Sequence, residues 1–216
     1  MDRKVKEIAF PKKPWVKYLA DNKGDFKIAA SNPLHIELVN KLVSMGNTFI
    51  EWGSGSGYMS TYVANRSGVK SVQGLDIYPE LVKMANETKA QNFLGTGTLD
   101  YMTDSDELKP AEIVYSDGLI EHYEDDDIVE LIEQMKKLAT RAIVINMPSM
   151  FYPWTQFGNE RFCQVKGQEL AYWEAKLEPF KEHLTELYYY GNKFFILGVI
   201  EGWMTKKPQS KKNSKQ

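Results

Sequence analysis

The chain has almost no cysteine and no long apolar run, and these absences exclude several classes of protein. Cys163 is the only cysteine among the 216 residues, so no internal disulfide can form. No cluster of Cys and His has metal-ligand spacing, so we predict no metal site. No run approaches the roughly 20 apolar residues that cross a bilayer, and the N-terminus lacks the apolar stretch of a secretory signal. We therefore expect a cytoplasmic protein with no membrane partner.

The chain also lacks a large excess of charge of either sign. Its formal net charge is −2, and 43% hydrophobic with 26% charged residues is ordinary for one globular domain. Basic residues gather at both ends. Residues 205–216 contain five lysines and no acid, which predicts a disordered basic tail. Residues 1–32 mix basic residues with prolines and aromatics, which favours a strap or lid over a helix. Residues 33–204 are then the folded domain.

A glycine-rich segment at residues 47–57, NTFIEWGSGSG, is the most informative stretch of the chain. Its apolar first half is typical of a buried strand. Gly53, Gly55 and Gly57 alternate with serines, so backbone N–H groups can come close to a ligand. Glu51 precedes the glycines and would place a carboxylate at the mouth of a parallel sheet. The segment therefore favours a cationic or hydroxylated ligand over a bare phosphate.

Strand-like and helix-like segments alternate along the rest of the chain. We predict helices from Pro33, Tyr58, Pro79 and Asp125, and one more marked by apolar residues from Leu170 to Leu184. Between them lie predicted strands at residues 69–76, 93–100, 111–117 and 142–146, and the chain closes with strand-like runs at 184–190 and 194–203. The short turn between the last two runs predicts an antiparallel hairpin. The predicted fold is α/β, a Rossmann-like, seven-stranded and mostly parallel sheet with helices on both faces.

Acids end three of the predicted strands: Glu51, Asp76 and Asp100. In a parallel sheet they would lie along the edge at which such folds bind ligands. Each acid alone could be a helix cap or a turn residue. Together with the glycine turn, the three acids indicate a binding site.

These residues resemble the motifs of class I S-adenosylmethionine-dependent methyltransferases, over roughly Pro33 to Trp203. Residues 51–57 resemble the first motif, Asp76-Ile77 the second-strand acid and residues 99–101 the third-strand position. Residues 116–122, SDGLIEH, are similar to the fourth-strand segment of the small-molecule branch. They differ from the Asn/Asp-Pro-Pro-aromatic motif of enzymes that methylate DNA bases, which disfavours that substrate.

The resemblance implies S-adenosylmethionine as the cofactor and assigns roles to several residues. Glu51 would lie near its ammonium group, Asp76 would accept from the ribose hydroxyls, and Asp100 would accept from the adenine amine. Ile77 and Tyr101 would flank the adenine. The cofactor-binding set that the resemblance implies is Glu51, Gly53, Ser54, Gly55, Gly57, Asp76, Ile77, Asp100, Tyr101, Ser116 and Gly118.

Catalysis of methyl transfer needs alignment and, where the nucleophile is protonated, a base. His122 follows the fourth strand and is our candidate base, because histidine titrates near neutrality. Its alternative role is to orient the loop. We predict acceptor contacts from the loop after the fifth strand and from the N-terminal segment, where aromatic and charged side chains could equally pack a lid. These residues are Trp15, Tyr18, Tyr152, Trp154, Glu160 and Arg161.

The resulting prediction is a methyltransferase that moves a methyl group from S-adenosylmethionine to an O or N nucleophile of a small molecule. Three alternatives stay open. An RNA or protein methyltransferase would share the core and could use the basic tail. A nicotinamide-dependent oxidoreductase is disfavoured by Glu51, by the glycine spacing and by the final hairpin. A non-catalytic subunit would bind the cofactor and activate a partner.

Overall fold

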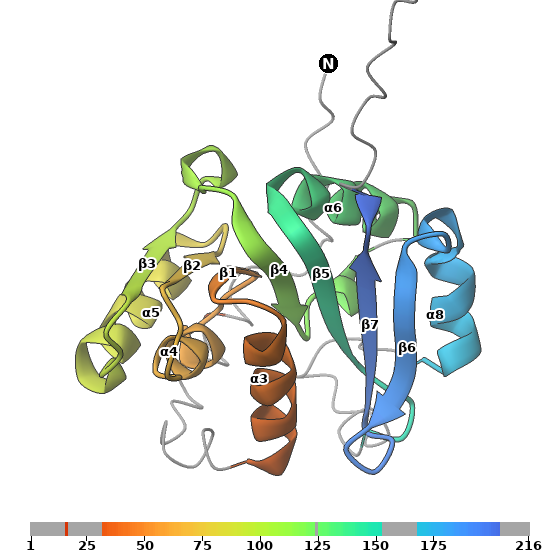
Figure 1. The fold of residues 1–216 in the computed structure, drawn as a ribbon, viewed down its shortest axis with the longest axis horizontal. Helices are drawn as coiled ribbons and strands as arrows, with labels where there is room; N and C mark the ends of the chain where they lie inside the picture. Colours follow the sequence, from red (N-terminus) through yellow and green to blue (C-terminus); the bar gives the residue numbers. More distant parts are fainter. Residues whose placement is uncertain (1–15, 17–31, 124, 153–167, 204–216) are drawn as a thin grey trace, which may run out of the picture.

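The protein forms one seven-stranded sheet with helices on both faces (Figure 1). The computed structural model describes residue 16 and residues 32–123, 125–152 and 168–203. The strand order is β3-β2-β1-β4-β5-β7-β6; the first five are parallel and β7 is antiparallel to both neighbours. The predicted fold class is confirmed. The strands are β1 Thr48–Trp52, β2 Ser71–Leu75, β3 Thr98–Met102, β4 Ala111–Asp117, β5 Ala139–Pro148, β6 Leu184–Tyr190 and β7 Phe195–Glu201.

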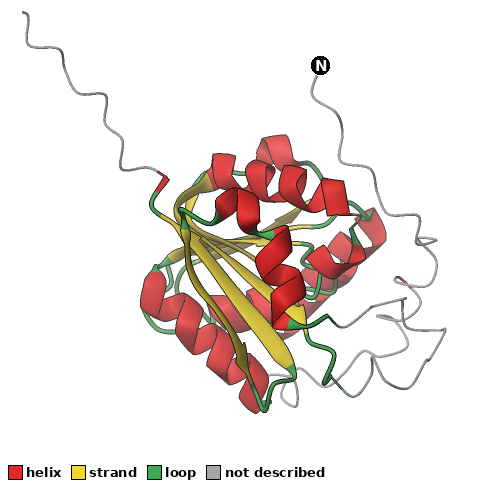
Figure 2. Cartoon of the chain, turned by 90° about the vertical axis from the view of Figure 1, so that its right-hand side faces the viewer, coloured by secondary structure: helices red, strands yellow, loops and turns green. Residues whose placement is uncertain are grey.

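Two hydrophobic cores lie on opposite faces of the sheet, which Figure 2 shows from the side. On one face α3 and α4 pack against the sheet; on the other face α6 and α8 do so. The helices are α3 Pro33–Met45, α4 Tyr58–Ala64, α5 Pro79–Asn92, α6 Asp125–Leu138 and α8 Leu170–Lys176, with short 3-10 helices η1 Ser105–Glu107, η2 Ile120–His122 and η3 Glu178–Phe180. Among the described helices, none is long and apolar enough to cross a membrane.

Several predicted boundaries differ from the structure, and two of these errors have a clear local cause. The third strand was expected at residues 93–100 but runs from Thr98 to Met102. A Cβ at Gly97 would lie 2.5 Å from the Lys70 carbonyl oxygen, so this glycine marks a close backbone approach before the strand begins. The helix expected to reach Leu184 ends at Lys176. Pro179 follows in η3, and proline cannot continue an α-helical hydrogen-bond ladder.

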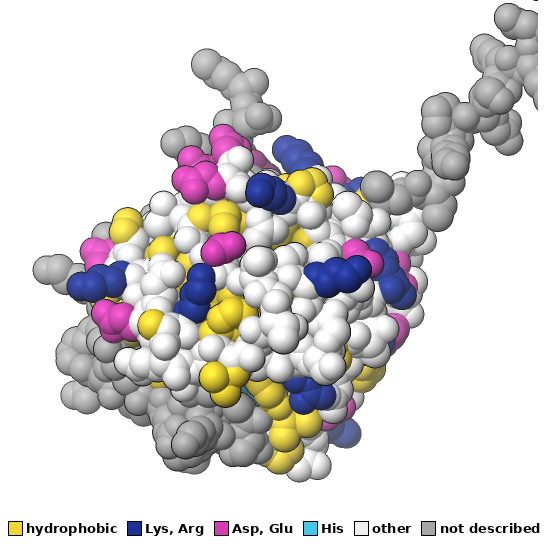
Figure 3. All heavy atoms as spheres, turned by 60° about the vertical axis from the view of Figure 1, so that its left-hand side comes forward, with side chains coloured by type: hydrophobic (Ala, Val, Ile, Leu, Met, Phe, Trp, Pro, Cys, Tyr) yellow, Lys and Arg dark blue, Asp and Glu magenta, His cyan; other side chains and the backbone are white. Residues whose placement is uncertain are grey.

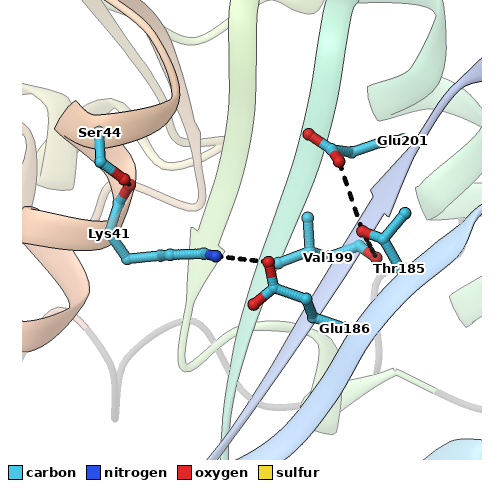
Figure 4. Close-up of polar contacts among 6 residues, drawn as sticks. All are labelled: Lys41, Ser44, Thr185, Glu186, Val199 and Glu201. Atoms are coloured by element: carbon cyan, nitrogen blue, oxygen red, sulfur yellow. Dashed lines mark hydrogen bonds and ion pairs between the residues drawn. The ribbon is translucent and has the colours of Figure 1, made fainter.

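The C-terminal hairpin contacts α3 through an ion pair and through close packing. Lys41 of α3 extends to Glu186 of β6, with 2.5 Å between Nζ and Oε1 (Figure 4). The turn between β6 and β7 keeps left-handed backbone at Gly191, where any Cβ would collide with Leu34 at the start of α3. Such a half-exposed ion pair contributes little stability, so the close packing is the stronger restraint. Together the two contacts fix the end of β6, which carries Tyr190, relative to α3.

Candidate functional site

The glycine loop between β1 and α4 has a backbone that glycine adopts without strain. Gly53, Gly55 and Gly57 have φ angles of 80°, 51° and 77°, all in the left-handed region. A Cβ at Gly53 would lie 2.8 Å from Leu119, and one at Gly57 would lie 2.6 Å from the Tyr101 hydroxyl. The loop therefore packs closely against both the turn after β4 and the end of β3.

Asp76 holds the glycine loop from the neighbouring strand. It directly follows β2, and its Oδ2 accepts a hydrogen bond from the Gly55 N–H at 2.9 Å. Its Oδ1 accepts from the Tyr78 N–H at 3.0 Å. A carboxylate oxygen can accept more than one hydrogen bond, so this side chain is chemically suited to accept from the hydroxyls of a ligand. The next side chain, Ile77, is 52% exposed although it is apolar, so a hydrophobic surface lies beside the carboxylate.

Glu51 is a buried acid beneath the glycine loop. Its side chain accepts a hydrogen bond from the Ser60 hydroxyl of α4. Burial is the main cause that raises the pKa of Glu51 to about 8; the Ser60 hydrogen bond opposes the shift and the nearby charge of Asp117 contributes to it. At neutral pH the carboxyl is therefore mostly protonated. A cation bound beside it would favour its ionisation.

The turn after β4 brings a second pair of buried ionisable groups to the same edge. Gly118 has a φ of 66°, and its N–H donates to the Asn146 carbonyl at 3.0 Å. Glu121 Oε1 lies 3.8 Å from His122 Nε2. Burial raises the pKa of Glu121 to about 8 and lowers the pKa of His122 to about 4, against a hydrogen bond between His122 and the Gly118 backbone. Between these values both groups are neutral, so at neutral pH the pair is not an ion pair.

Three polar atoms at this edge are buried without a hydrogen-bond partner among the described residues: Ser54 Oγ, Ser116 Oγ and Glu121 Oε2. An unmade hydrogen bond of this kind costs about 1–3 kcal/mol. A polar ligand at the edge would satisfy them. The described residues contain no group of three potential metal ligands.

Asp100 does not end the third strand as predicted, because β3 continues two residues past it. Asp100 pairs with Gln73 inside the sheet register, and its 65% exposed carboxylate lies 3.3 Å from Lys89 Nζ. The Tyr101 hydroxyl donates to the Gly57 carbonyl at 2.9 Å, so the partly buried Tyr101 supports the glycine loop. The acid that follows β3 is Asp104, whose carboxylate accepts from the Asp106 N–H at 2.9 Å. Placing the strand end too early hid this residue in the sequence.

Of the predicted acceptor contacts, only Tyr152 lies within the described residues. Its ring centroid is 5.0 Å from that of Phe195 in β7. Trp15, Tyr18, Trp154, Glu160 and Arg161 lie outside the described residues.

A hydrogen-bonded group on the same side of the sheet was not predicted. The Tyr190 hydroxyl donates to Asn146 Oδ1 at 2.6 Å, and Asn146 Nδ2 donates to Asp117 Oδ1 at 2.5 Å. The sequence holds no signal for this group, since its members are 29 and 44 residues apart.

Comparison with known proteins gives matches of fold only. No family model matches the chain, and no curated protein matches it. Magnesium protoporphyrin IX methyltransferase from Synechocystis PCC 6803, with bound SAH (S-adenosylhomocysteine), is 20% identical, with 88% of this chain and 92% of that chain covered and a TM-score of 0.60. An O-methyltransferase family protein from Burkholderia thailandensis is 15% identical, covers 94% and 66% of the two chains and has a TM-score of 0.66.

The methyltransferase domain of a bacterial Hen1 protein is also similar, at 15% identity, 80% and 100% coverage and a TM-score of 0.63. At these identities the similarity establishes the fold. The chain has the fold of the class I S-adenosylmethionine-dependent methyltransferases.

Proposed function

We propose that the protein is a methyltransferase that moves a methyl group from S-adenosylmethionine to an oxygen or nitrogen nucleophile of a small molecule. The observation that carries this proposal is the pair of buried carboxyl groups beside the glycine loop, those of Glu51 and Glu121. Ionisation of these carboxyl groups would stabilise a cation bound beside them, such as the ammonium or sulfonium group of S-adenosylmethionine, whereas they offer nothing to a pyrophosphate. The antiparallel β7 also differs from the strand order 3-2-1-4-5-6 of dinucleotide-binding sheets.

The residues at the edge fit this cofactor at both of its ends. Glu51 and the glycine backbone would hold the methionine end, and the unpartnered hydroxyls of Ser54 and Ser116 are available there. Asp76 would accept from the ribose hydroxyls beside the exposed Ile77, which would contact the adenine. We assign the adenine amine to Asp104, since Asp100 lies inside the strand register. The backbone of four glycines would lie close to the cofactor: Gly53, Gly55, Gly57 and Gly118. Tyr101 would support the glycine loop through its hydrogen bond to the Gly57 carbonyl.

S-adenosylmethionine would supply a methyl group that its sulfonium already activates. The protein then has to align the acceptor, exclude water and receive a proton. His122 is one candidate for the proton acceptor, because its buried imidazole is neutral at neutral pH. With a pKa lowered to about 4 it is a weak base, which makes orientation of the turn its competing role.

A small-molecule acceptor is supported by the nature of several proteins with this fold. They include mitomycin 7-O-methyltransferase and an O-methyltransferase crystallised with apigenin. A ribosomal protein methylase from Lactobacillus delbrueckii has the fold as well, so a macromolecular acceptor is the second candidate. On the face shown in Figure 3, basic and acidic side chains are interspersed, and no basic stripe that could follow a polyanion crosses the described surface in view.

Tritium-labelled S-adenosylmethionine distinguishes these acceptors. The protein is incubated with a cell extract separated into small-molecule, RNA and protein fractions, and the Asp76→Ala variant serves as the control. We expect enzyme-dependent label in the small-molecule fraction. Label in RNA or protein alone would contradict the proposed acceptor class. Tight binding of SAH with no labelled fraction until a second chain is added would instead favour a non-catalytic subunit.

A further inference from the structure

A row of buried polar side chains continues from the cofactor edge toward the C-terminal hairpin. Asp117 ends β4, and Asn146 stands beside it in the parallel register of β4 and β5. Tyr190 ends β6, beyond the intervening strand β7. Asn146 and Tyr190 are buried, whereas Asp117 is half-buried. Buried polar side chains that form a connected network usually fix one arrangement of the groups in it.

The hydrogen bonds in this row can run in only one direction. A carboxylate only accepts, so Asn146 must offer its NH2 group to Asp117, over 2.5 Å. The amide oxygen is then left to accept from the Tyr190 hydroxyl, over 2.6 Å. Tyr190 thus holds the amide and the amide holds Asp117 Oδ1. Among the described residues no hydrogen bond reaches the other oxygen, Asp117 Oδ2.

Asp117 is connected through Asn146 to Tyr190, which belongs to a cluster of aromatic rings. The charge of Asp117 raises the pKa values of Glu51 and Glu121, so it is close to both. The Phe195 ring lies 5.7 Å from the Tyr190 ring and 5.0 Å from the Tyr152 ring. A flat or apolar acceptor packed on these rings would meet Asp117 at its reacting end.

We propose, resting on the methyltransferase function proposed above, that Asp117 binds the acceptor through its N–H or O–H group and takes its proton. Asn146 and Tyr190 are positioning residues that hold this carboxylate. As the acceptor lone pair bonds to the methyl carbon, the proton passes to Asp117 Oδ2 and the carbon–sulfur electron pair stays on sulfur. The products are the methylated acceptor and SAH. The acceptor is therefore an amine or a hydroxyl compound, since an anionic carboxylate would be repelled by Asp117.

Sinefungin tests this proposal without knowledge of the acceptor. In this analogue of S-adenosylmethionine a carbon replaces the sulfur and an ammonium group replaces the methyl group, so the ammonium lies where the methyl would be and points its N–H groups toward the acceptor site. Calorimetry gives the Kd of SAH and of sinefungin for each variant. We expect wild type to bind sinefungin about 10- to 100-fold more tightly than SAH, the range for a hydrogen bond between charged groups. Asp117→Asn should lose this preference and keep its affinity for SAH.

Two tyrosine variants test the positioning role. Tyr190→Phe should lower the preference for sinefungin by about threefold to tenfold at constant SAH affinity. Tyr188→Phe, a partly exposed tyrosine of the same strand, is the matched control and should change neither value. An equal loss of both ligands in Asp117→Asn would overturn the proposal, because Asp117 would then hold the cofactor itself.

Failure of the proposed function has a different signature from failure of this inference. If wild type binds neither SAH nor sinefungin, both are wrong. If it binds both without preference, only the role of Asp117 is wrong. A crystal structure of the wild-type sinefungin complex decides the matter should Asp117→Asn not fold. If the ammonium group that replaces the methyl group in sinefungin lies within hydrogen-bond distance of Asp117, the proposal is supported. If that ammonium group makes hydrogen bonds only to other groups, the proposal is overturned.

Discussion

The buried carboxyl of Glu51 makes the stability of the fold depend on pH in a direction opposite to that of an ion-paired acid. In the unfolded chain a glutamate loses its proton near pH 4.5, whereas burial raises the pKa of Glu51 in the folded protein to about 8. Between these values the folded state holds one proton more than the unfolded state. Stability must therefore fall as the pH rises through this window.

The size of the effect follows from the one extra proton. One proton over one pH unit corresponds to about 1.4 kcal/mol, so from about pH 6.5 to about pH 8 Glu51 removes about 2 kcal/mol of stability. A glutamine side chain has nearly the same shape as that of glutamate, but it does not ionise. The stability of Glu51→Gln relative to wild type should therefore rise by about 2 kcal/mol across this range. Glu121, with a similarly raised pKa, stays in both proteins, and its effect cancels.

Urea unfolding followed by tryptophan fluorescence at the two pH values measures this difference. The buried Trp52 and Trp173 provide the signal. Glu174→Gln, an exposed glutamate of α8, is the control and should behave like wild type at both pH values. An unfolding free energy of Glu51→Gln that differs from wild type by the same amount at both pH values would refute the reasoning, because Glu51 would then titrate normally in the fold.

Three further predictions concern the loop and the turn at the carboxyl edge. Asp76→Ala should abolish SAH binding by calorimetry and cost about 1–3 kcal/mol of stability, because the Gly55 and Tyr78 N–H groups lose their acceptor; near-wild-type affinity would remove Asp76 from the cofactor site. Gly57→Ala should lower the unfolding free energy by more than about 1 kcal/mol, since φ is 77° and the new Cβ would lie 2.7 Å from Ala85; unchanged stability would show that the loop relaxes freely. His122→Ala should leave the pH dependence of turnover on an identified acceptor unchanged, because burial lowers the pKa of its imidazole to about 4 and Asp117 takes the proton; a changed pH dependence would make the imidazole the base.

The sequence defines the architecture well because local signals agree along most of the chain. Asn32 and Pro33 start α3 as expected, with Asn32 Oδ1 accepting from the Leu34 N–H at 3.0 Å. The fourth strand runs from Ala111 to Asp117 as predicted. The glycine spacing at Gly53, Gly55 and Gly57 correctly predicts a turn of left-handed residues.

The site is predicted less completely, because its side chains come together only through the sheet register. A two-residue error in placing the end of β3 was enough to favour Asp100 over Asp104. Tyr101 was expected beside a ligand but bonds the backbone of Gly57, a contact between residues 44 positions apart. The row formed by Asp117, Asn146 and Tyr190 depends on β7 lying between β5 and β6. No local pattern records such an arrangement.

The central claim is that the acidic glycine-loop site takes S-adenosylmethionine and not a dinucleotide. Calorimetric titration of the wild-type protein with SAH and, separately, with NADH at neutral pH tests it most directly. We expect one SAH to bind per chain and NADH to give no heat of binding. Binding of NADH together with no binding of SAH would contradict it.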